Sequence, residues 1–177
     1  FTLEKGSSYE ELIAALCSTV SYRETVKLTL PEGWNSFQMA KAAAAAGLCT
    51  EEEYLAAANA LDYDFDWMKD ISTDPDKLTV LEGFLYPETY SFYTDATARD
   101  IVTTQLREFE KKVLTEENKT ALKDSGFTLE EWVIFASIVQ KESASVEEMY
   151  NVSSVFHNRL SNASEYPMLQ SCTTNNF

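Results

Sequence analysis

The stretch TLEEWVIFASIVQKESASVEEMYNVSSVFHNRL, residues 128–160, predicts two consecutive helices joined by a very short link. Thr128 and Glu131 stand at the spacing of a capping box, which marks the start of the first helix. The apolar residues that follow recur at helical spacing and also fill the rest of the circumference. We therefore expect a central, buried helix that ends near Glu142.

The second helix begins after the link, where Ser145 and Glu148 repeat the capping-box spacing. Asn158 and Arg159 fall late in this helix. An Asn amide can bond sugar hydroxyls and an Arg can hold a carboxylate, but both residue types also serve as partners of a helix C-terminus. His157 is the only histidine and has no adjacent nucleophile in a recognisable elbow, so a packing or capping role is expected.

Glu142 is the residue of this stretch that best suits a chemical role. It follows an apolar flank and stands at a helix C-terminus, whose partial negative charge disfavours a second one. Both effects raise the pKa of a carboxyl group, and a protonated acid near neutral pH is what general-acid chemistry requires. The alternative is a surface Glu that pairs with Lys141 or Arg159, which spacing alone favours.

The rest of the chain predicts a soluble α+β domain that is predominantly helical. Its 177 residues are 45% hydrophobic, enough for a sizeable core. Apolar periodicity, caps and turn residues predict a strand at 26–30, helices at 8–16, 36–46, 50–60, 97–113 and 115–124, an irregular connection at 61–80 and a packed aromatic stretch at 81–93.

Composition excludes several functional classes. The formal charge of −15 argues against nucleic acid, because phosphate binding needs a basic surface. Three widely spaced cysteines and one histidine do not form a metal-ligand pattern, so neither a metal nor a cofactor is expected. No run of residues is long and apolar enough to span a membrane, which leaves room for an anchor only upstream of Phe1.

Four segments then carry a family resemblance. LEGFLYPETYSF (81–92) is similar to the motif LEGYLFPDTY, and ASIVQKESASVEEMYNVSSVFHNRL (136–160) resembles ASIVEKE…VASVFxNRL. PMLQSCTTNNF (167–177) resembles MxLQSDPTV, and VKLTLPEGWN (26–35) resembles the strand and turn that open a catalytic domain. These motifs, and their order along the chain, resemble those of the YceG-like endolytic murein transglycosylases.

The resemblance implies a domain organisation. Residues 1–24 would be the tail of a LysM-like subdomain. Residues 25–177 would be a YceG-like catalytic domain, truncated at its C-terminal end, with a buried helix that carries the catalytic Glu. The implied setting is the outer face of the bacterial cytoplasmic membrane, with a single-pass anchor upstream of Phe1 and murein synthases (penicillin-binding proteins) as neighbours.

The implied activity is endolytic cleavage of the MurNAc–GlcNAc bonds of peptidoglycan, leaving 1,6-anhydroMurNAc ends, in cell-wall assembly and strand-length control. Glu142 matches the second acid of the family's EKE triplet. A single acid suffices for this lyase, because the C6 hydroxyl of the sugar attacks C1 in place of water. Glu142 would first donate a proton to the leaving oxygen and then accept the proton of that hydroxyl.

The matching motifs also supply candidates for substrate contacts or for orienting Glu142. These are Glu82, Tyr86, Glu88, Tyr90, Asn158, Arg159, Gln170 and Ser171. The aromatic rings of Phe84, Tyr86 and Tyr90 suit walls for sugar rings, although core packing explains them equally well.

The chain departs from the family pattern at two places. Gln140 replaces the first acid of the triplet, and residues two apart on a helix do not share a face. Cys172 and Thr173 replace the Asp-Pro of the third motif, which removes any role that this Asp would have.

Two other functions fit parts of the sequence. A lysozyme-like muramidase would leave reducing muramic ends. A non-catalytic peptidoglycan-binding module would bind murein and release nothing, with or without Glu142.

Overall fold

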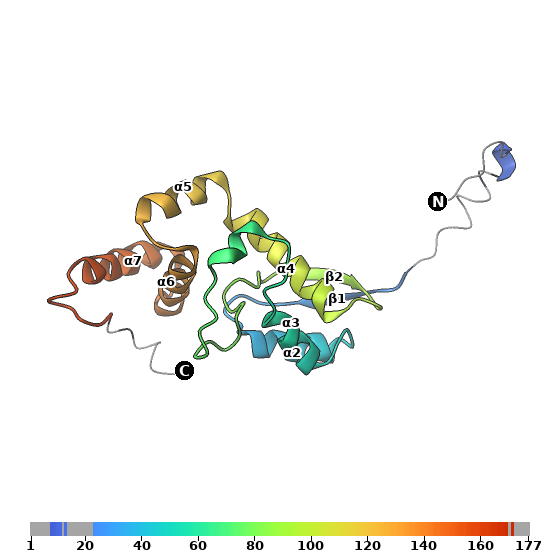
Figure 1. The fold of residues 1–177 in the computed structure, drawn as a ribbon, viewed down its shortest axis with the longest axis horizontal. Coiled ribbons are helices and arrows are strands. Elements are labelled where there is room, and N and C mark those ends of the chain that lie inside the picture. The colour runs from blue at the N-terminus through green and yellow to red at the C-terminus, as the bar shows by residue number, and fades with distance from the viewer. Residues whose placement is uncertain (1–7, 12, 14–22, 170, 172–177) are drawn as a thin grey trace.

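The computed structural model describes residues 8–11, 13, 23–169 and 171, and the described chain is mostly helical (Figure 1). Its elements are, in order, β1 (Thr25–Thr29), α2 (Ser36–Ala45), α3 (Glu51–Ala58), the 3-10 helix η1 (Asp66–Asp70), β2 (Thr89–Tyr93), α4 (Ala98–Val113), α5 (Glu116–Ser125), α6 (Leu129–Glu142) and α7 (Val146–Ser161). Residues 9–11 and 13 are also helical, within the range predicted for the first helix. The predicted helices at 36–46, 50–60, 97–113, 115–124 and 128–142 are thus confirmed to within a few residues.

Helix starts follow the local capping signals. At α6, the Thr128 hydroxyl accepts the N–H of Glu131 (3.2 Å), and the Glu131 carboxylate accepts the N–H of Thr128 (2.8 Å). The N–H and the hydroxyl of Thr128 both donate to the Glu131 carboxylate, and these bonds lower the pKa of Glu131. At α7 only half of the predicted box forms, because the Glu148 carboxylate takes the N–H of Ala144 rather than that of Ser145.

A two-stranded antiparallel sheet forms one side of the core. β1 pairs with β2 in a register that sets Leu28 opposite Tyr90. The strand β2 was not predicted, although the packing of its aromatic residues was. Burial alternates along TYSFY, with Tyr90 and Phe92 buried, as expected for a strand with one covered face.

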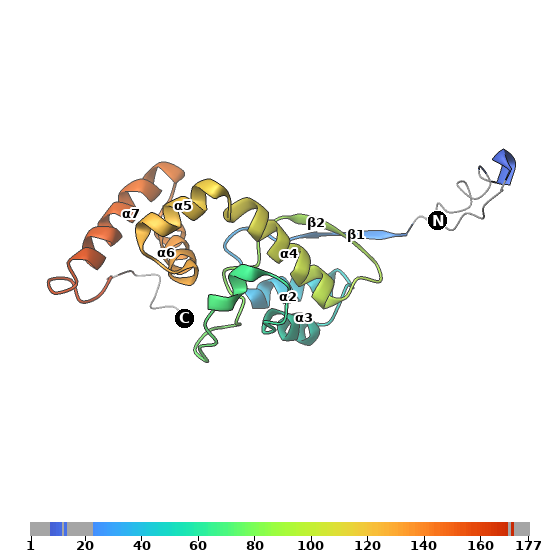
Figure 2. The same cartoon turned by 45° about the horizontal axis from the view of Figure 1, so that its top comes forward.

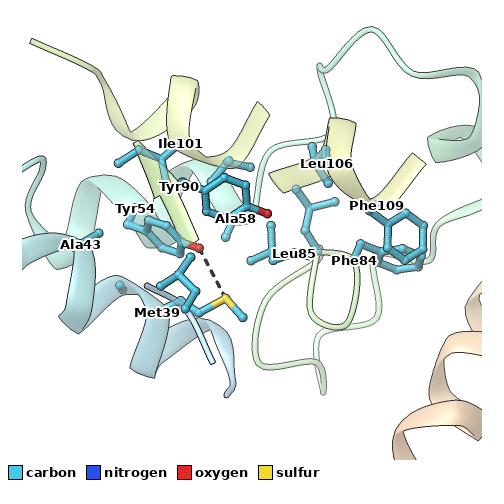
Figure 3. Packing of buried hydrophobic residues seen from close by; sticks show 14 of the residues in the cluster. Met39, Ala43, Tyr54, Ala58, Phe84, Leu85, Tyr90, Ile101, Leu106 and Phe109 are labelled. Carbon is cyan, nitrogen blue, oxygen red and sulfur yellow. Dashed lines mark hydrogen bonds between the residues drawn. The ribbon is translucent and has the colours of Figure 1, made fainter. Parts of the chain in front are cut away.

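The main core lies between the sheet and helices α2, α3 and α4 (Figure 3). Inside it, a tyrosine, a glutamine and a methionine form a hydrogen-bonded group. The Tyr54 hydroxyl donates to Oε1 of Gln105 (2.6 Å), and the Gln105 amide donates to Sδ of Met39 (3.5 Å). Tyr54 and Gln105 are fully buried, and burial raises the pKa of Tyr54. These mutual bonds offset the cost of removing the polar groups from water.

Helices α6 and α7 lie, together with α5, to one side of this core in both views of the fold (Figures 1 and 2). The prediction of a fully buried α6 is wrong: Val139 is its one buried residue, and Ile134 is 50% exposed. The physical reason is that, among the described residues, α6 is covered by α7 and by the segment before β2, and its remaining faces are open.

Aromatic rings join α6 to α7. Phe135 of α6 lies 4.6 Å from the His157 ring and 6.4 Å from the Phe156 ring, between centroids. Phe127, just before α6, stacks on His157 at 5.7 Å. His157 is exposed, and its ring contacts agree with the packing alternative of the predicted packing or capping role.

Three contacts fix α6 to the segment that precedes β2. Glu130 accepts the N–H of Ser72 (2.9 Å) and forms an ion pair with Lys77, with both charged side chains only about 15% exposed. Further along α6, Val133 lies against Gly83 so closely that a Cβ at position 83 would stand 2.8 Å from Cγ1 of Val133. The start of the LEGF motif therefore sets the position of the helix that ends in Glu142.

Candidate active site

Glu142 is the last residue of α6 and is half-buried. The helix stops there because Ser143 adopts an extended conformation (ψ 133°). Its N–H and its hydroxyl both bond to the carbonyl of Val139, at 3.1 and 2.7 Å. Gln140 is exposed, in agreement with the prediction that it does not share the face of Glu142.

Ser171 is brought directly to this carboxyl group. Its hydroxyl donates to Oε1 of Glu142 at 2.5 Å, and the residue is 6% exposed. Arg159 of α7 donates from Nη1 to the carbonyl of Leu169, two residues before Ser171. The end of α6 thus contacts Ser171, and the end of α7 contacts Leu169, two residues earlier in the chain. Three of the predicted site residues, Glu142, Arg159 and Ser171, belong to one local structure.

The residues of the LEGF motif have mainly structural contacts. Glu82 accepts the N–H of Ser36 (3.1 Å), the first residue of α2. A carboxylate at a helix N-terminus is favoured by the helix dipole, so Glu82 ties the loop to α2. Its predicted role toward substrate has no support from this contact.

Burial distinguishes between the two interpretations of the aromatic residues. Phe84 is 1% exposed and Tyr90 is 7% exposed, and both belong to the main core. The Tyr90 hydroxyl donates to the carbonyl of Tyr86 (2.7 Å), and burial raises the pKa of Tyr90. Core packing is the interpretation that this arrangement favours for Phe84 and Tyr90. Tyr86 is half-buried and keeps part of its surface available.

The remaining candidates stand apart or outside the described residues. Glu88 is exposed and accepts the N–H of Thr89 (3.0 Å), and Asn158 is exposed on α7. Gln170, like the substituted positions Cys172 and Thr173, lies outside the described residues.

Other kinds of site find little support in the described part of the chain. It contains no group of three His, Cys, Asp or Glu side chains that could hold a metal ion. Two surface hollows of about 430 and 530 Å³ lie beside β2 and between α3 and α4, and Glu142 lines neither. No helix within the described ranges has the length and apolar character of a membrane span.

Sequence reasoning missed the contacts that assemble the site. The carbonyl of Leu169 is a backbone group, and nothing in the sequence marks it as the partner of Arg159. The ion pair of Lys77 with Glu130 had no signal either. Gly83 did have a signal in the sequence, because a Gly inside an apolar, aromatic motif indicates a close approach of another chain segment.

The fold places this chain among proteins of known structure. A crystal structure of a yceG-like protein from Listeria monocytogenes superposes with a TM-score of 0.68, covers 96% of this chain and 57% of that chain, and is 23% identical. This match supports the fold class, a mostly helical domain with a small sheet. The sequence match is broader: the model of the YceG-like family matches residues 1–177. The chain therefore belongs to the YceG-like family, which confirms the resemblance carried by its motifs.

Two named relatives are similar to most of this chain. An endolytic murein transglycosylase of Streptococcus pneumoniae is 28% identical and aligns with 90% of this chain and 32% of its own length. An endolytic murein transglycosylase of Bacillus subtilis is 25% identical, over 90% of this chain and 46% of its own length. The chain thus spans less than half the length of these curated relatives.

Proposed function

We propose that the protein is an endolytic lytic transglycosylase of peptidoglycan, with Glu142 as its catalytic acid and base. Family membership and the names of the two relatives support the reaction class. The observation that carries the assignment of the residue is the bond from Ser171 to Glu142, since it joins two family motifs at one carboxyl group.

The reaction divides into two proton transfers at the same residue. Glu142, protonated, gives its proton to the oxygen that links MurNAc to GlcNAc, and the C1–O bond breaks with its electron pair on that oxygen. The C6 hydroxyl of the MurNAc residue then bonds to C1 and passes its proton to the Glu142 carboxylate. The product is a 1,6-anhydroMurNAc end, the acid is regenerated, and no water is consumed.

This reaction needs only one carboxyl group from the protein. Hydrolases that activate a water molecule or form a glycosyl-enzyme generally use two carboxylates on opposite sides of the bond. Here the second acid is replaced by a hydroxyl of the substrate. Glu142 offers the remaining carboxyl group from the C-terminal end of α6, where it is half-buried.

Substrate contacts are proposed for the candidates that retain exposed surface. Tyr86 offers a partly open ring, Glu88 an exposed carboxylate, and Asn158 an exposed amide on α7. Such groups can bind sugar faces and hydroxyls. Gln170 is proposed to join them because it stands beside Ser171 in the third motif.

The wider setting follows from the same proposal. The protein would act at the outer face of the cytoplasmic membrane, held by an anchor upstream of Phe1, close to murein synthases whose glycan strands it shortens. Residues 1–24 would be the tail of a LysM-like subdomain, and residues 25–177 would belong to the catalytic domain. Neither a metal nor a cofactor enters the proposed chemistry.

The test uses the full-length protein with purified murein sacculi. Wild type should release muropeptides with 1,6-anhydro ends, identified by mass spectrometry. Glu142→Gln should lower that release by about a thousandfold or more, since both proton transfers are lost. Glu110→Gln, an exposed carboxylate of α4, is the matched control and should cleave like wild type.

Three outcomes would contradict the proposal. Full cleavage by Glu142→Gln would remove the central residue. Reducing muramic ends would indicate a muramidase. Sedimentation with sacculi, with nothing soluble released by wild type, would indicate a binding module.

A further inference from the structure

A buried hydroxyl group is in contact with the proposed acid. Ser171 is 6% exposed, and its hydroxyl donates to Oε1 of Glu142 at 2.5 Å. Buried hydroxyl groups are almost always hydrogen-bonded, and bonds from O–H to an ionised oxygen are short and strong. The contact therefore fixes one oxygen of the carboxyl group in space and favours its ionised form.

Arg159 holds the segment that carries Ser171. Its guanidinium donates to the carbonyl of Leu169 and lies 5.9 Å from the ring of Phe156. Phe156 is 5% exposed and meets Phe135 of α6 edge-on. Phe156 is the buried residue of α7, so Arg159 stands one turn from the packed part of the helix, and its charge-assisted bond to the carbonyl is of the stronger kind. The connection thus runs from the α6–α7 interface through Arg159 and Leu169 to Ser171, and from there to Glu142.

We propose that Ser171 is a positioning residue for Glu142, and that Arg159 acts through Leu169 to hold Ser171 in place. This inference rests on the proposed function, since it assigns the geometry of the same acid. Ser171 would orient the carboxyl group for protonation of the leaving oxygen. By favouring the ionised form, it would also set the pH at which the acid releases its proton.

Kinetics of the full-length protein on soluble glycan strands test the proposal. Ser171→Ala removes the donor, so the protonated acid should persist to higher pH, and the alkaline limb of the kcat profile should move up by about 0.5 to 1 pH unit. At the optimum, kcat should fall about tenfold while KM changes less than about twofold. Ser171→Thr keeps a hydroxyl and should restore both values.

Arg159 gives an independent arm of the experiment. Arg159→Met should shift the alkaline limb in the same direction as Ser171→Ala, although its side chain is bonded to a carbonyl and not to Glu142. The double variant should shift it no further than Ser171→Ala alone, because both changes act on one contact. Ser154→Ala and Arg107→Met, at exposed positions of α7 and α4, are the matched controls.

The outcomes separate the two proposals. If wild type releases anhydro ends and Glu142→Gln does not, but Ser171→Ala leaves the alkaline limb in place, the positioning role is wrong and the catalytic assignment stands. If wild type releases no anhydro ends, the proposed function itself fails. Thermal midpoints equal to those of wild type ensure that a loss of kcat is not a loss of fold. Should Ser171→Ala unfold, an unshifted limb in Arg159→Met would still overturn the proposal.

Discussion

At the scale of single residues, position 83 requires a glycine for two separate reasons. Its φ of +86° is a region that residues with a Cβ enter only at a cost of about 1 to 2 kcal/mol. Its Cβ position is also taken by Cγ1 of Val133, at 2.8 Å. Because Val is branched at Cβ, its methyl groups have little freedom to move aside.

Gly83→Ala should therefore destabilise the fold by about 3 kcal/mol, measured as the free energy of unfolding in urea. Gly47→Ala is the matched control, because Gly47 has a similar φ of +73° and nothing within 4 Å of its Cβ position. Gly47→Ala should lower the free energy of unfolding only by the conformational cost of the positive φ, about 1 kcal/mol. Equal losses in the two variants would show that the contact with Val133 has no energetic weight.

At the residue scale, the sequence singled out Glu142 and Ser171 as candidates because each stands in a motif of its own, and the structure joins their side chains. Their contact was not predicted, because the two residues are 29 apart and the path between them depends on the turn after α7. Arg159 was a candidate for a substrate carboxylate or a cap. Its actual partner is a backbone carbonyl, and every residue has one, so residue types gave no indication of it.

At the scale of elements, capping signals were the most dependable part of the sequence. Helices α3, α4 and α6 begin at boxes in which a Thr hydroxyl and a carboxylate exchange bonds with backbone N–H groups. These interactions are local, so the sequence contains all of their participants. The strand β2 was not predicted, because β1, with which it pairs, is distant in the chain. A short aromatic stretch does not indicate which strand it pairs with.

The box at α6 makes a pH prediction. Bonds from Thr128 lower the pKa of Glu131 below its unfolded value of 4.5, so the stabilisation is present above about pH 4.5 and is lost as the pH falls through the folded pKa. Glu131→Gln keeps the acceptor but does not titrate. Its thermal midpoint should therefore fall less than that of wild type when the pH is lowered from about 7 to about 3.

The matched control for this pH prediction is Glu117→Gln. Glu117 stands in the first turn of α5 but one residue before the position that a capping box uses. If Glu117→Gln reduces the pH dependence as much as Glu131→Gln does, the box is not its source.

At the scale of the whole molecule, the described chain has two parts connected by an exposed helix. One is the core around the sheet and α2 to α4, and the other is the α6–α7 pair. α5 has no buried residue, so it links the parts without packing them together. The contacts of Glu130 and Val133 with the segment before β2 thus hold α6 in place.

Lys77→Met should loosen α6 selectively. The variant leaves the carboxylate of Glu130 poorly solvated and without its ion-pair partner, which is costly. Hydrogen exchange of α6 and α7 amides should accelerate about tenfold or more, with little change in α3 and α4. Lys119→Met removes an exposed ion pair of α5 and should change little. Uniform acceleration in all helices would contradict the two-part description.

The whole-molecule prediction from sequence was least accurate for α6. Its apolar circumference predicted a central helix, yet the described chain covers only part of it. Periodicity indicates which residues avoid water but does not identify the segment that covers them. The fold class was predicted because it depends on the number and type of elements, and these are set mainly by local patterns.

The bond between Ser171 and Glu142 also has a consequence for the order in which the site is completed. During synthesis the ribosome adds Glu142 first and Ser171 29 residues later. Helix α6 can form as soon as its own residues have emerged, since its cap and backbone bonds are local. The carboxyl group acquires its hydroxyl donor only after α7 and the following turn have been translated. A nascent chain that has just finished α6 therefore carries the proposed acid but not its hydroxyl donor.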